Sequence, residues 1–143
     1  NKLFDYIKCS SANLDSLIVF GEIYGVGVQD LHYGAKQEKG YRVFDIAING
    51  EYMNWEAMKE ICQNVGLPVV PELALGIFTF EQLVEMSQGN THLSDTHMME
   101  GTVVRPLLES RWKQGEFDPN PKRKIFKIIS DAYLMRKSGT EHH

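Results

Sequence analysis

What the sequence lacks narrows the kind of protein first. Its 143 residues include only two cysteines, Cys9 and Cys62, which lie far apart and lack metal-ligand spacing. No apolar run approaches the ~20 residues of a membrane-spanning helix. The first residues alternate charged and apolar groups, unlike a secretory signal. We therefore expect a reducing, cytoplasmic compartment, no membrane contact and two buried thiols.

The composition suits one globular domain, but its charge is unevenly distributed. A hydrophobic content of 43% can supply a core, and 24% charged residues are ordinary. Residues 1–104 carry six Lys/Arg against fourteen Asp/Glu, whereas residues 105–137 carry nine against four. The basic final third can attract phosphate backbones. On charge alone, a solvated surface is the simpler interpretation.

Hydrophobic patterning and turn signals predict several β-strands. Asn49-Gly50 follows a β-rich run and is a strong two-residue hairpin signal. The predicted strands are 17–25, 41–48, 100–106 and 124–130, with a possible edge strand at 68–74 and polar loops at 26–40 and 109–122. The last two strands are expected to be buried.

Helices are predicted between these strands and at both ends of the chain. Asn54 and Gly66 mark the ends of one helix, and Thr79 with Gln82 forms a capping-box pattern that starts another, ending at Gly89. Shorter helical segments are predicted at 2–8 and 130–137. The order of elements indicates an α+β domain with a mainly antiparallel sheet and inserted helices.

Two charged residues interrupt apolar β segments where packing does not need them. Glu100 opens one run and Lys127 lies inside the other. An unpaired buried charge is costly, so each is expected to have a specific partner. A metal-bound polyphosphate would supply both partners, whereas a structural ion pair between the two residues is the simpler alternative.

Three further residues are candidates for chemistry or for structure. Glu22 lies between a strand and a glycine, where a carboxylate usually faces water. Phe44 is ordinarily a core residue, and Asp45 is expected on the opposite strand face as a hydrogen-bonded structural acid.

Four segments, in this order, resemble nucleotidyltransferase motifs of ATP-dependent RNA ligases. They are Gly21–Leu31, Arg42-Val43-Phe44-Asp45-Ile46 (like motif III), Glu100-Gly101-Thr102-Val103-Val104-Arg105-Pro106 (like motif IV) and Phe126-Lys127-Ile128-Ile129-Ser130 (like motif V). The first looks particularly like the phage and bacterial branch related to the T4 RNA ligase 2 group. The resemblance implies part of an ATP-grasp-like nucleotidyltransferase domain over residues 1–137, with 138–143 as a tail or tag remnant.

The resemblance also implies a role for each candidate residue. Phe44 would stack on adenine, and Glu22 would accept hydrogen bonds from ribose hydroxyls or from the RNA end. Glu100 would help to bind Mg²⁺ or Mn²⁺, and Lys127 would contact the α-phosphate of ATP. In the family, a lysine attacks ATP to form lysyl-AMP, AMP passes to an RNA 5′-phosphate, and a 3′-hydroxyl displaces it. The implied partners are RNA ends or a nicked duplex.

The sequence departs from the family pattern at two points. It has no Lys-x-Asp-Gly motif, and neither Lys2 nor Lys8 lies in a matching context. The chain is therefore expected to be a piece that lacks an N-terminal segment, with a split enzyme or a degenerate binder as alternatives. Ile129 replaces the second motif V lysine of many relatives, and Lys124 or Arg123 could compensate.

The sequence is also compatible with two other functions. One is a non-catalytic nucleotide- or RNA-binding module, which the missing nucleophile also fits. The other is DNA ligase or capping guanylyltransferase activity in the same superfamily. A partial domain would also expose sheet edges, so self-association is expected.

Overall fold

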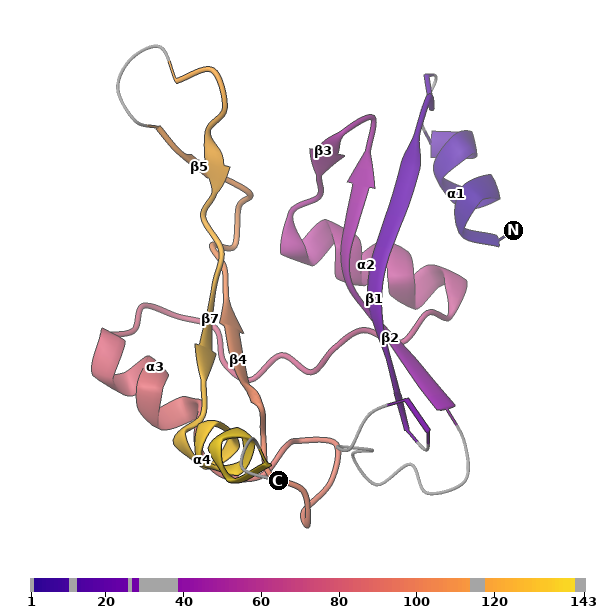
Figure 1. Ribbon diagram of the computed structural model, residues 1–143. Coiled ribbons are helices and arrows are strands. Elements are labelled where there is room, and N and C mark those ends of the chain that lie inside the picture. The colour runs from indigo at the N-terminus through magenta and orange to yellow at the C-terminus, as the bar shows by residue number, and fades with distance from the viewer. Residues whose placement is uncertain (1, 11–12, 26, 29–38, 114–117, 141–143) are drawn as a thin grey trace. The chain divides into compact units, whose positions relative to one another are not determined.

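The computed structural model describes residues 2–10, 13–25, 27–28, 39–113 and 118–140 (Figure 1). The chain is α+β, as predicted, and the strand pairs β2–β3, β4–β7 and β5–β6 are antiparallel. Its elements are α1 (Lys2–Ser10), β1 (Leu17–Gly25), β2 (Lys39–Ile48), β3 (Glu51–Tyr52), α2 (Trp55–Val65), α3 (Phe80–Met86), β4 (Gly101–Val104), β5 (Arg111–Trp112), β6 (Lys122–Arg123), β7 (Phe126–Ile129) and α4 (Asp131–Thr140). No helix among the described residues is long and apolar enough to cross a membrane.

The chain divides into two compact units, each assembled from separate stretches of sequence. Unit 1 comprises Asn1–Tyr24, Lys39–Val70 and Pro106–Lys124, and unit 2 comprises Gly25–Glu38, Pro71–Arg105 and Ile125–His143. The motif-like segments are thus shared between the units: Glu22 and Phe44 lie in unit 1, whereas Glu100 and Lys127 lie in unit 2.

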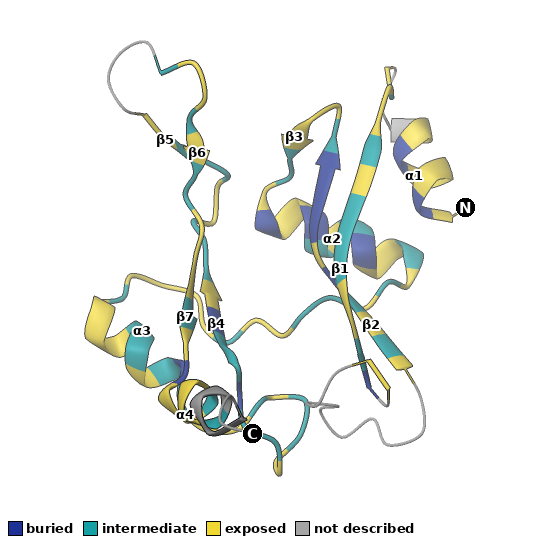
Figure 2. Ribbon diagram, in the orientation of Figure 1, coloured by how far each residue is buried: buried dark blue, intermediate teal, exposed yellow. Residues whose placement is uncertain are grey.

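Unit 1 is a three-stranded sheet in the order β1-β2-β3, with α1 and α2 packed together beside it (Figure 1). Figure 2 shows the buried positions concentrated along β2 and on one side of each helix. Burying these apolar side chains is the main source of stability. The buried core consists of Leu3, Ile7, Val43, Ile46, Trp55, Met58 and Cys62.

The turn and the helix ends of unit 1 mostly form where the sequence predicts them. Asn49 (φ 51°) and Gly50 (φ 83°) form the hairpin turn between β2 and β3, with the positive dihedrals that a type I′ turn requires. Gly66 ends α2 in the left-handed conformation. Asn54 precedes α2 but does not cap it, because its Oδ1 accepts a hydrogen bond from the backbone N–H of Glu109 at 2.7 Å.

Two segments of unit 1 differ from the prediction. The possible edge strand at 68–74 is reduced to one parallel bridge, in which Val69 pairs with Val43. The polar loop at 109–122 contains a short antiparallel ladder, β5–β6, in which Arg111 pairs with Arg123 and Trp112 with Lys122. Strands of two residues carry too little hydrophobic alternation to be recognised from sequence.

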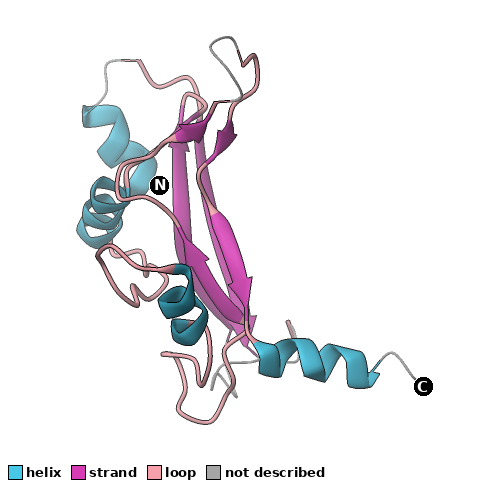
Figure 3. Cartoon of the chain, turned by 90° about the vertical axis from the view of Figure 1, so that its left-hand side faces the viewer, coloured by secondary structure: helices cyan, strands magenta, loops and turns pink. Residues whose placement is uncertain are grey.

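Unit 2 contains the antiparallel pair β4–β7, in which Gly101 pairs with Ile129 and Val103 with Lys127. α3 begins with the predicted capping box between Thr79 and Gln82 and ends at Met86, earlier than predicted. α4 follows β7 directly (Figure 3) and extends to Thr140, three residues beyond the predicted end. Ser130 is fully buried at this junction, and its hydroxyl donates to the Met99 carbonyl.

The burial predicted for the last two strands and for Cys9 is not observed. The strands β4 and β7 are not buried in unit 2, because Val103 is 59% exposed and Phe126 is 46% exposed. Short two-stranded ladders have one covered face at most, and here the face bearing Thr102 is the covered one. Cys62 is buried, but Cys9 is exposed on the outer side of α1.

Candidate functional site

The first group of candidate residues lies on β1 and β2, on the side of the sheet away from the helix-packed core. Leu17 and Val19 pack against that core, so Phe20 and Glu22 project from the other face of β1. The Phe20 ring lies 6.4 Å from the Phe44 ring, centroid to centroid. Phe44 is 40% exposed and is therefore not a core residue. An exposed aromatic ring beside a carboxylate provides both an apolar surface and a hydrogen-bond acceptor.

Two glycines allow tyrosine rings to lie flat across β1 and β2. A Cβ atom on Gly21 would lie 2.2 Å from the Tyr41 ring, and one on Gly40 would lie 2.3 Å from the Tyr24 ring. Each ring thus occupies the space that a side chain on the neighbouring strand would need. Gly21 immediately precedes Glu22, so this packing fixes the strand from which Glu22 projects.

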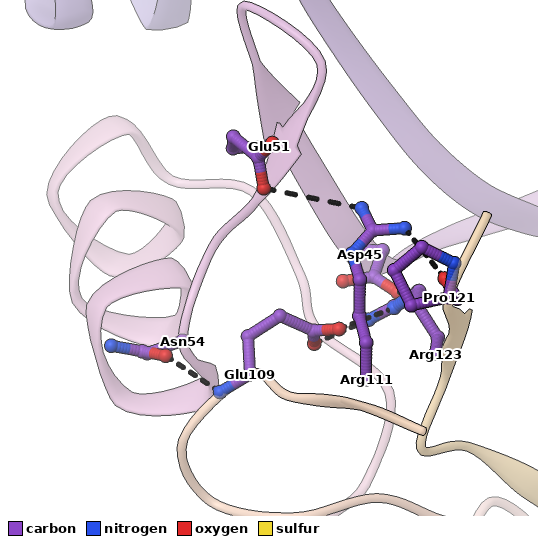
Figure 4. A network of polar contacts seen from close by, with 7 residues as sticks. All are labelled: Asp45, Glu51, Asn54, Glu109, Arg111, Pro121 and Arg123. Atoms are coloured by element: carbon purple, nitrogen blue, oxygen red, sulfur yellow. Dashed lines mark hydrogen bonds and ion pairs between the residues drawn. The ribbon is translucent and has the colours of Figure 1, made fainter. Parts of the chain in front are cut away.

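A second group in unit 1 surrounds one guanidinium (Figure 4). Arg123 donates from Nη1 to Asp45 Oδ2 at 2.7 Å, from Nε to Glu109 Oε1 at 2.7 Å, and from Nη2 to Glu109 Oε2 at 2.8 Å. The side chain of Asp45 is 3% exposed, and those of Arg123 and Glu109 are each 14% exposed. The hydrogen bonds to Glu109, and then the single hydrogen bond to Asp45, outweigh the opposing effect of burial and raise the pKa of Arg123 above its ordinary value. The carboxylates thus favour the charged form of a group that is already protonated under ordinary conditions.

Aromatic contacts connect this network to the first group. The Arg123 guanidinium carbon lies 3.6 Å from the centroid of the Tyr52 ring, which stacks on Phe20 at 5.5 Å. Phe44 and Asp45 are thus joined through a chain of contacts, although strict alternation predicts that they point to opposite faces. Val43 and Ile46 are three residues apart and both lie in the core, so alternation is interrupted between them.

Asp45 is a hydrogen-bonded structural acid, as the sequence suggested, and Arg123, considered as a replacement for the second motif V lysine, donates to carboxylates. Three nitrogens of Arg123 already donate to carboxylates, so the guanidinium is a poor substitute for a phosphate-binding lysine. Arg111 flanks the network, with Nη1 donating to the Pro121 carbonyl at 3.3 Å and Nη2 lying 3.9 Å from Glu51 Oε2 (Figure 4). Sequence reasoning missed Glu109 and Tyr52, because neither carries a local signal.

The third group lies in unit 2 and consists of Glu100 and Lys127. Lys127 Nζ lies 2.5 Å from Glu100 Oε1, with the lysine side chain 43% exposed and the glutamate side chain 27% exposed. The ion pair that the sequence left as the simpler alternative therefore forms, but neither charge is buried as expected. Both side chains remain open to solvent and to a ligand.

Gly101 explains how two residues that are not direct partners come into contact. Val103 is the residue opposite Lys127, and regular alternation would place Glu100 on the other face of β4. Gly101, between them, has a φ of 153°, and a Cβ atom there would lie 2.0 Å from the Ile128 carbonyl oxygen. Only glycine fits this close strand approach, which departs from regular β geometry.

The described residues contain no group of three or more His, Cys, Asp or Glu side chains arranged to hold a metal ion. Mg²⁺ and Mn²⁺ in nucleotide enzymes are often held by one or two carboxylates together with phosphates and water. Glu100 fits that limited contribution, because its carboxylate is accessible and adjacent to a cation that could contact the same phosphate. The side chains therefore suit a metal brought in by a nucleotide.

Within this α+β fold, unit 1 presents an exposed aromatic ring beside a carboxylate, and unit 2 presents an accessible lysine–carboxylate pair whose chemistry suits phosphate and a divalent metal. A family model described as RNA ligase matches residues 1–129, so the chain belongs to the RNA ligase family. A search of curated proteins finds no significant match.

Solved structures of Naegleria gruberi RNA ligase share the fold. A mutant with ATP and Mn has a TM-score of 0.69 and 22% identity over 96% of this chain and 37% of that chain. The complex with PPi has a TM-score of 0.66 and 23% identity, covering 96% and 39%. A mutant with AMP and Mn has a TM-score of 0.63 and 21% identity, covering 94% and 37%. The present chain thus spans less than two fifths of these structures.

Proposed function

We propose that this chain is the part of an RNA ligase adenylyltransferase domain that binds ATP and a divalent metal. The parent protein would seal RNA 5′-phosphate and 3′-hydroxyl ends through lysyl-AMP and RNA-adenylate. The observation that carries the proposal is the accessible pair of Glu100 and Lys127 at the motif IV-like and motif V-like strands of a chain that belongs to this family. The similar Naegleria structures were solved with ATP, AMP, PPi or Mn, which supports this ligand set.

In the proposed function, each accessible side chain has a role suited to its chemistry. Phe44 offers an exposed ring on which adenine can stack, and Glu22, on the strand beside it, accepts hydrogen bonds from ribose or from the RNA end. Lys127 stabilises negative charge on the α-phosphate, for which it exchanges its present partner Glu100. Glu100, released from the lysine, would hold Mg²⁺ or Mn²⁺ directly or through water.

The proposal places the adenylylated lysine outside these 143 residues, because no Lys-x-Asp-Gly pattern occurs within them. The chain by itself would bind nucleotide without forming a covalent adduct. Residues 1–137 would then be the contributed portion of the domain, and 138–143 a tail. Pairing with the segment that supplies the lysine would also cover exposed sheet edges that otherwise favour self-association.

The test is covalent labelling of the intact gene product with radiolabelled ATP or GTP in Mg²⁺ or Mn²⁺. We expect an adduct with ATP, and a loss of about 10²-fold or more in labelling rate for Lys127→Ala, since it removes a charge aimed at the phosphate. Phe44→Ala should weaken ATP binding by about tenfold through loss of stacking. Phe4→Ala, which alters an exposed ring on α1, is the matched control and should label normally.

Different results would support the other functions. Labelling by GTP instead of ATP would favour a capping guanylyltransferase. Sealing of nicked DNA but not of RNA ends would favour a DNA ligase. No adduct with either nucleotide would contradict the ligase proposal and favour a non-catalytic binding module.

A further inference from the structure

The β5–β6 ladder has two chemically different faces. Arg111 and Arg123 pair across the ladder and point into the carboxylate network of unit 1 (Figure 4). Trp112 and Lys122 form the next cross-strand pair and therefore project from the opposite face. Lys124 is two residues beyond Lys122 and shares that face, with its Nζ 4.9 Å from the centroid of the Trp112 ring. The outer face is thus an aromatic ring between two lysines.

This outer face is open, and nothing in the core of unit 1 requires it. Trp112 is 60% exposed, which is unusual for the largest apolar side chain. In the described part of the chain, no ion pair engages Lys122 or Lys124, whereas Arg111 and Arg123 both face carboxylates. The arginine face of the ladder has a structural role, because it binds the carboxylates of unit 1. The Trp112 face has no such structural role among the described residues.

A hollow of about 240 Å³ lies beside the ring and is lined by Trp112, Asp118, Asn120 and Lys122. Asp118 is the one carboxylate among these residues, and its Oδ1 accepts a hydrogen bond from the backbone N–H of Asn120 at 3.0 Å. The lining thus combines a ring face, a cation and amide and carboxylate groups that can contact the polar edge of a base. The negative charge of Asp118 repels a phosphate inside the hollow. The phosphates of a bound nucleotide chain would therefore lie nearer to the ammonium groups of the two lysines.

We propose that the face formed by Trp112, Lys122 and Lys124, here called the ladder face, binds single-stranded RNA. A base stacks on Trp112 while the two lysines contact the adjoining phosphates. Every base has a π-face, and stacking on an exposed aromatic between cations is the usual means of holding an unpaired strand without sequence preference. This inference rests on the proposed function and extends it by naming where the strand that leads to the sealed end is held.

The choice of unpaired RNA follows from the geometry of the three side chains. A ring can stack on a base only when that base is not already stacked within a duplex. Two lysines on one face match a backbone that carries regular negative charge, and the basic final third of the chain supports the same partner. An acidic protein would need only the lysines and would make no use of the exposed ring in this arrangement.

The test measures binding of a fluorescent, 5′-phosphorylated, unstructured RNA oligonucleotide to the full 143-residue chain by anisotropy at several salt concentrations. Trp112→Ala should weaken binding by roughly tenfold, the loss of one stacked base. Lys122→Gln with Lys124→Gln should lower the slope of log K against log salt by about 1.4, because each phosphate contact on a single strand contributes about 0.7. Trp112→Phe should retain most of the affinity, since it keeps a stacking surface.

The matched control is the pair Phe4 and Lys8 on α1, another exposed ring with a lysine Nζ over it, at 5.7 Å. Phe4→Ala with Lys8→Gln should leave both the affinity and the salt slope unchanged. Wild-type affinity and slope in the ladder-face variants would overturn the proposal, as would a wild-type chain that binds no RNA at low salt. Equal binding of polyglutamate, lost in the double lysine variant but kept in Trp112→Ala, would overturn it in favour of an acidic protein partner.

Failure of the proposed function can be told apart from failure of this inference. Nucleotide labelling depends on Phe44 and Lys127, neither of which lies on the ladder face. We expect the Trp112→Ala variant of the intact gene product to form its nucleotide adduct at the normal rate. RNA binding through the ladder face without any nucleotide adduct would contradict the ligase proposal and leave the RNA surface supported.

Discussion

Two contacts between a cation and carboxylates, one in each unit, differ in almost every physical respect. Lys127 and Glu100 form a single contact on a short ladder, with side chains 43% and 27% exposed. Arg123 makes three hydrogen bonds to two carboxylates, stacks on Tyr52 and is 14% exposed. The exposed pair is free to exchange partners, whereas the buried network is committed to holding its own unit together.

The difference shows what burial does to the energetics of charge. An exposed lysine–carboxylate pair is screened by water and contributes about 0–1 kcal/mol, so a phosphate or a metal can compete for either member. Removing one partner from a buried, hydrogen-bonded pair leaves the other desolvated and costs about 3–5 kcal/mol. Reactive charge and structural charge are therefore separated between accessible and buried positions in this chain.

The largest expected effect is the loss of a carboxylate from the buried network. Asp45→Ala should lower the free energy of unfolding of unit 1 by about 3–5 kcal/mol, because it leaves the desolvated guanidinium without one acceptor. Thiol accessibility provides a measurement specific to this unit. Burial raises the pKa of the Cys62 thiol, so Cys62 should react slowly with a disulfide reagent in the folded protein, whereas exposed Cys9 reacts at once. The variant should expose Cys62 at a lower denaturant concentration.

Glu56→Gln is the control for this experiment, because it removes an exposed pair on α2 in the same unit. Glu56 lies 2.8 Å from Lys59, and their side chains are 58% and 29% exposed. Its loss should change stability by no more than about 0.5 kcal/mol. If Asp45→Ala lowered the free energy of unfolding by less than about 1 kcal/mol, water would be solvating the guanidinium in place of Asp45. The contrast between the two contacts would then disappear.

The second prediction concerns the exposed pair. Glu100→Gln should change the stability of unit 2 by less than about 1 kcal/mol, because the lysine it leaves behind is solvated. The same substitution should nevertheless lower the rate of nucleotide labelling by about 10²-fold if the carboxylate holds the metal. Denaturant titration of the chain and labelling of the intact gene product give the two numbers.

A large loss of both stability and labelling in Glu100→Gln would contradict the assignment of Glu100 as a metal-binding residue. If Glu100→Gln destabilised unit 2 as strongly as Asp45→Ala destabilises unit 1, the slow labelling would follow from unfolding. The pair would then be structural, which is the simpler alternative that the sequence left open. Raising the Mn²⁺ concentration should partly restore labelling only if the residue contributes to metal binding.

The sequence was informative where the signal is local. The Asn49-Gly50 turn, the Gly66 stop and the Thr79–Gln82 capping box all depend on residues within four positions of one another, and all are confirmed. Burial depends on which other segments cover a strand. For that reason an apolar run such as Phe126–Ile129 was wrongly predicted to be buried.

The candidate site shows the same limit. The pairing of Glu100 with Lys127 was foreseen as one alternative, because each charge interrupts an apolar segment. The network around Arg123 connects residues 45, 52, 109 and 123, and nothing in their sequence spacing indicates that they meet. Asn54 is the clearest case, since its cap signal is strong but a distant backbone N–H, that of Glu109, takes the oxygen. Long-range partners can override a local preference.

The smallest expected effect is at a carboxylate that is fully exposed and bound mainly by backbone. Its own backbone N–H and then the Thr79 hydroxyl lower the pKa of Glu81, in the first turn of α3, from its ordinary value of 4.5. Because the pKa of Glu81 is lower in the folded state, the charged carboxylate stabilises the fold at pH values above its pKa in the unfolded state. This contribution is lost as the pH falls through its pKa in the folded state. Denaturant titrations at pH 6 and pH 3 should therefore show a smaller acid-induced loss for Glu81→Gln than for wild type. Identical losses of stability in the two proteins would mean that the Glu81 carboxylate makes no stabilising interaction in the folded state. A larger loss in the variant would mean that folding raises the pKa of Glu81.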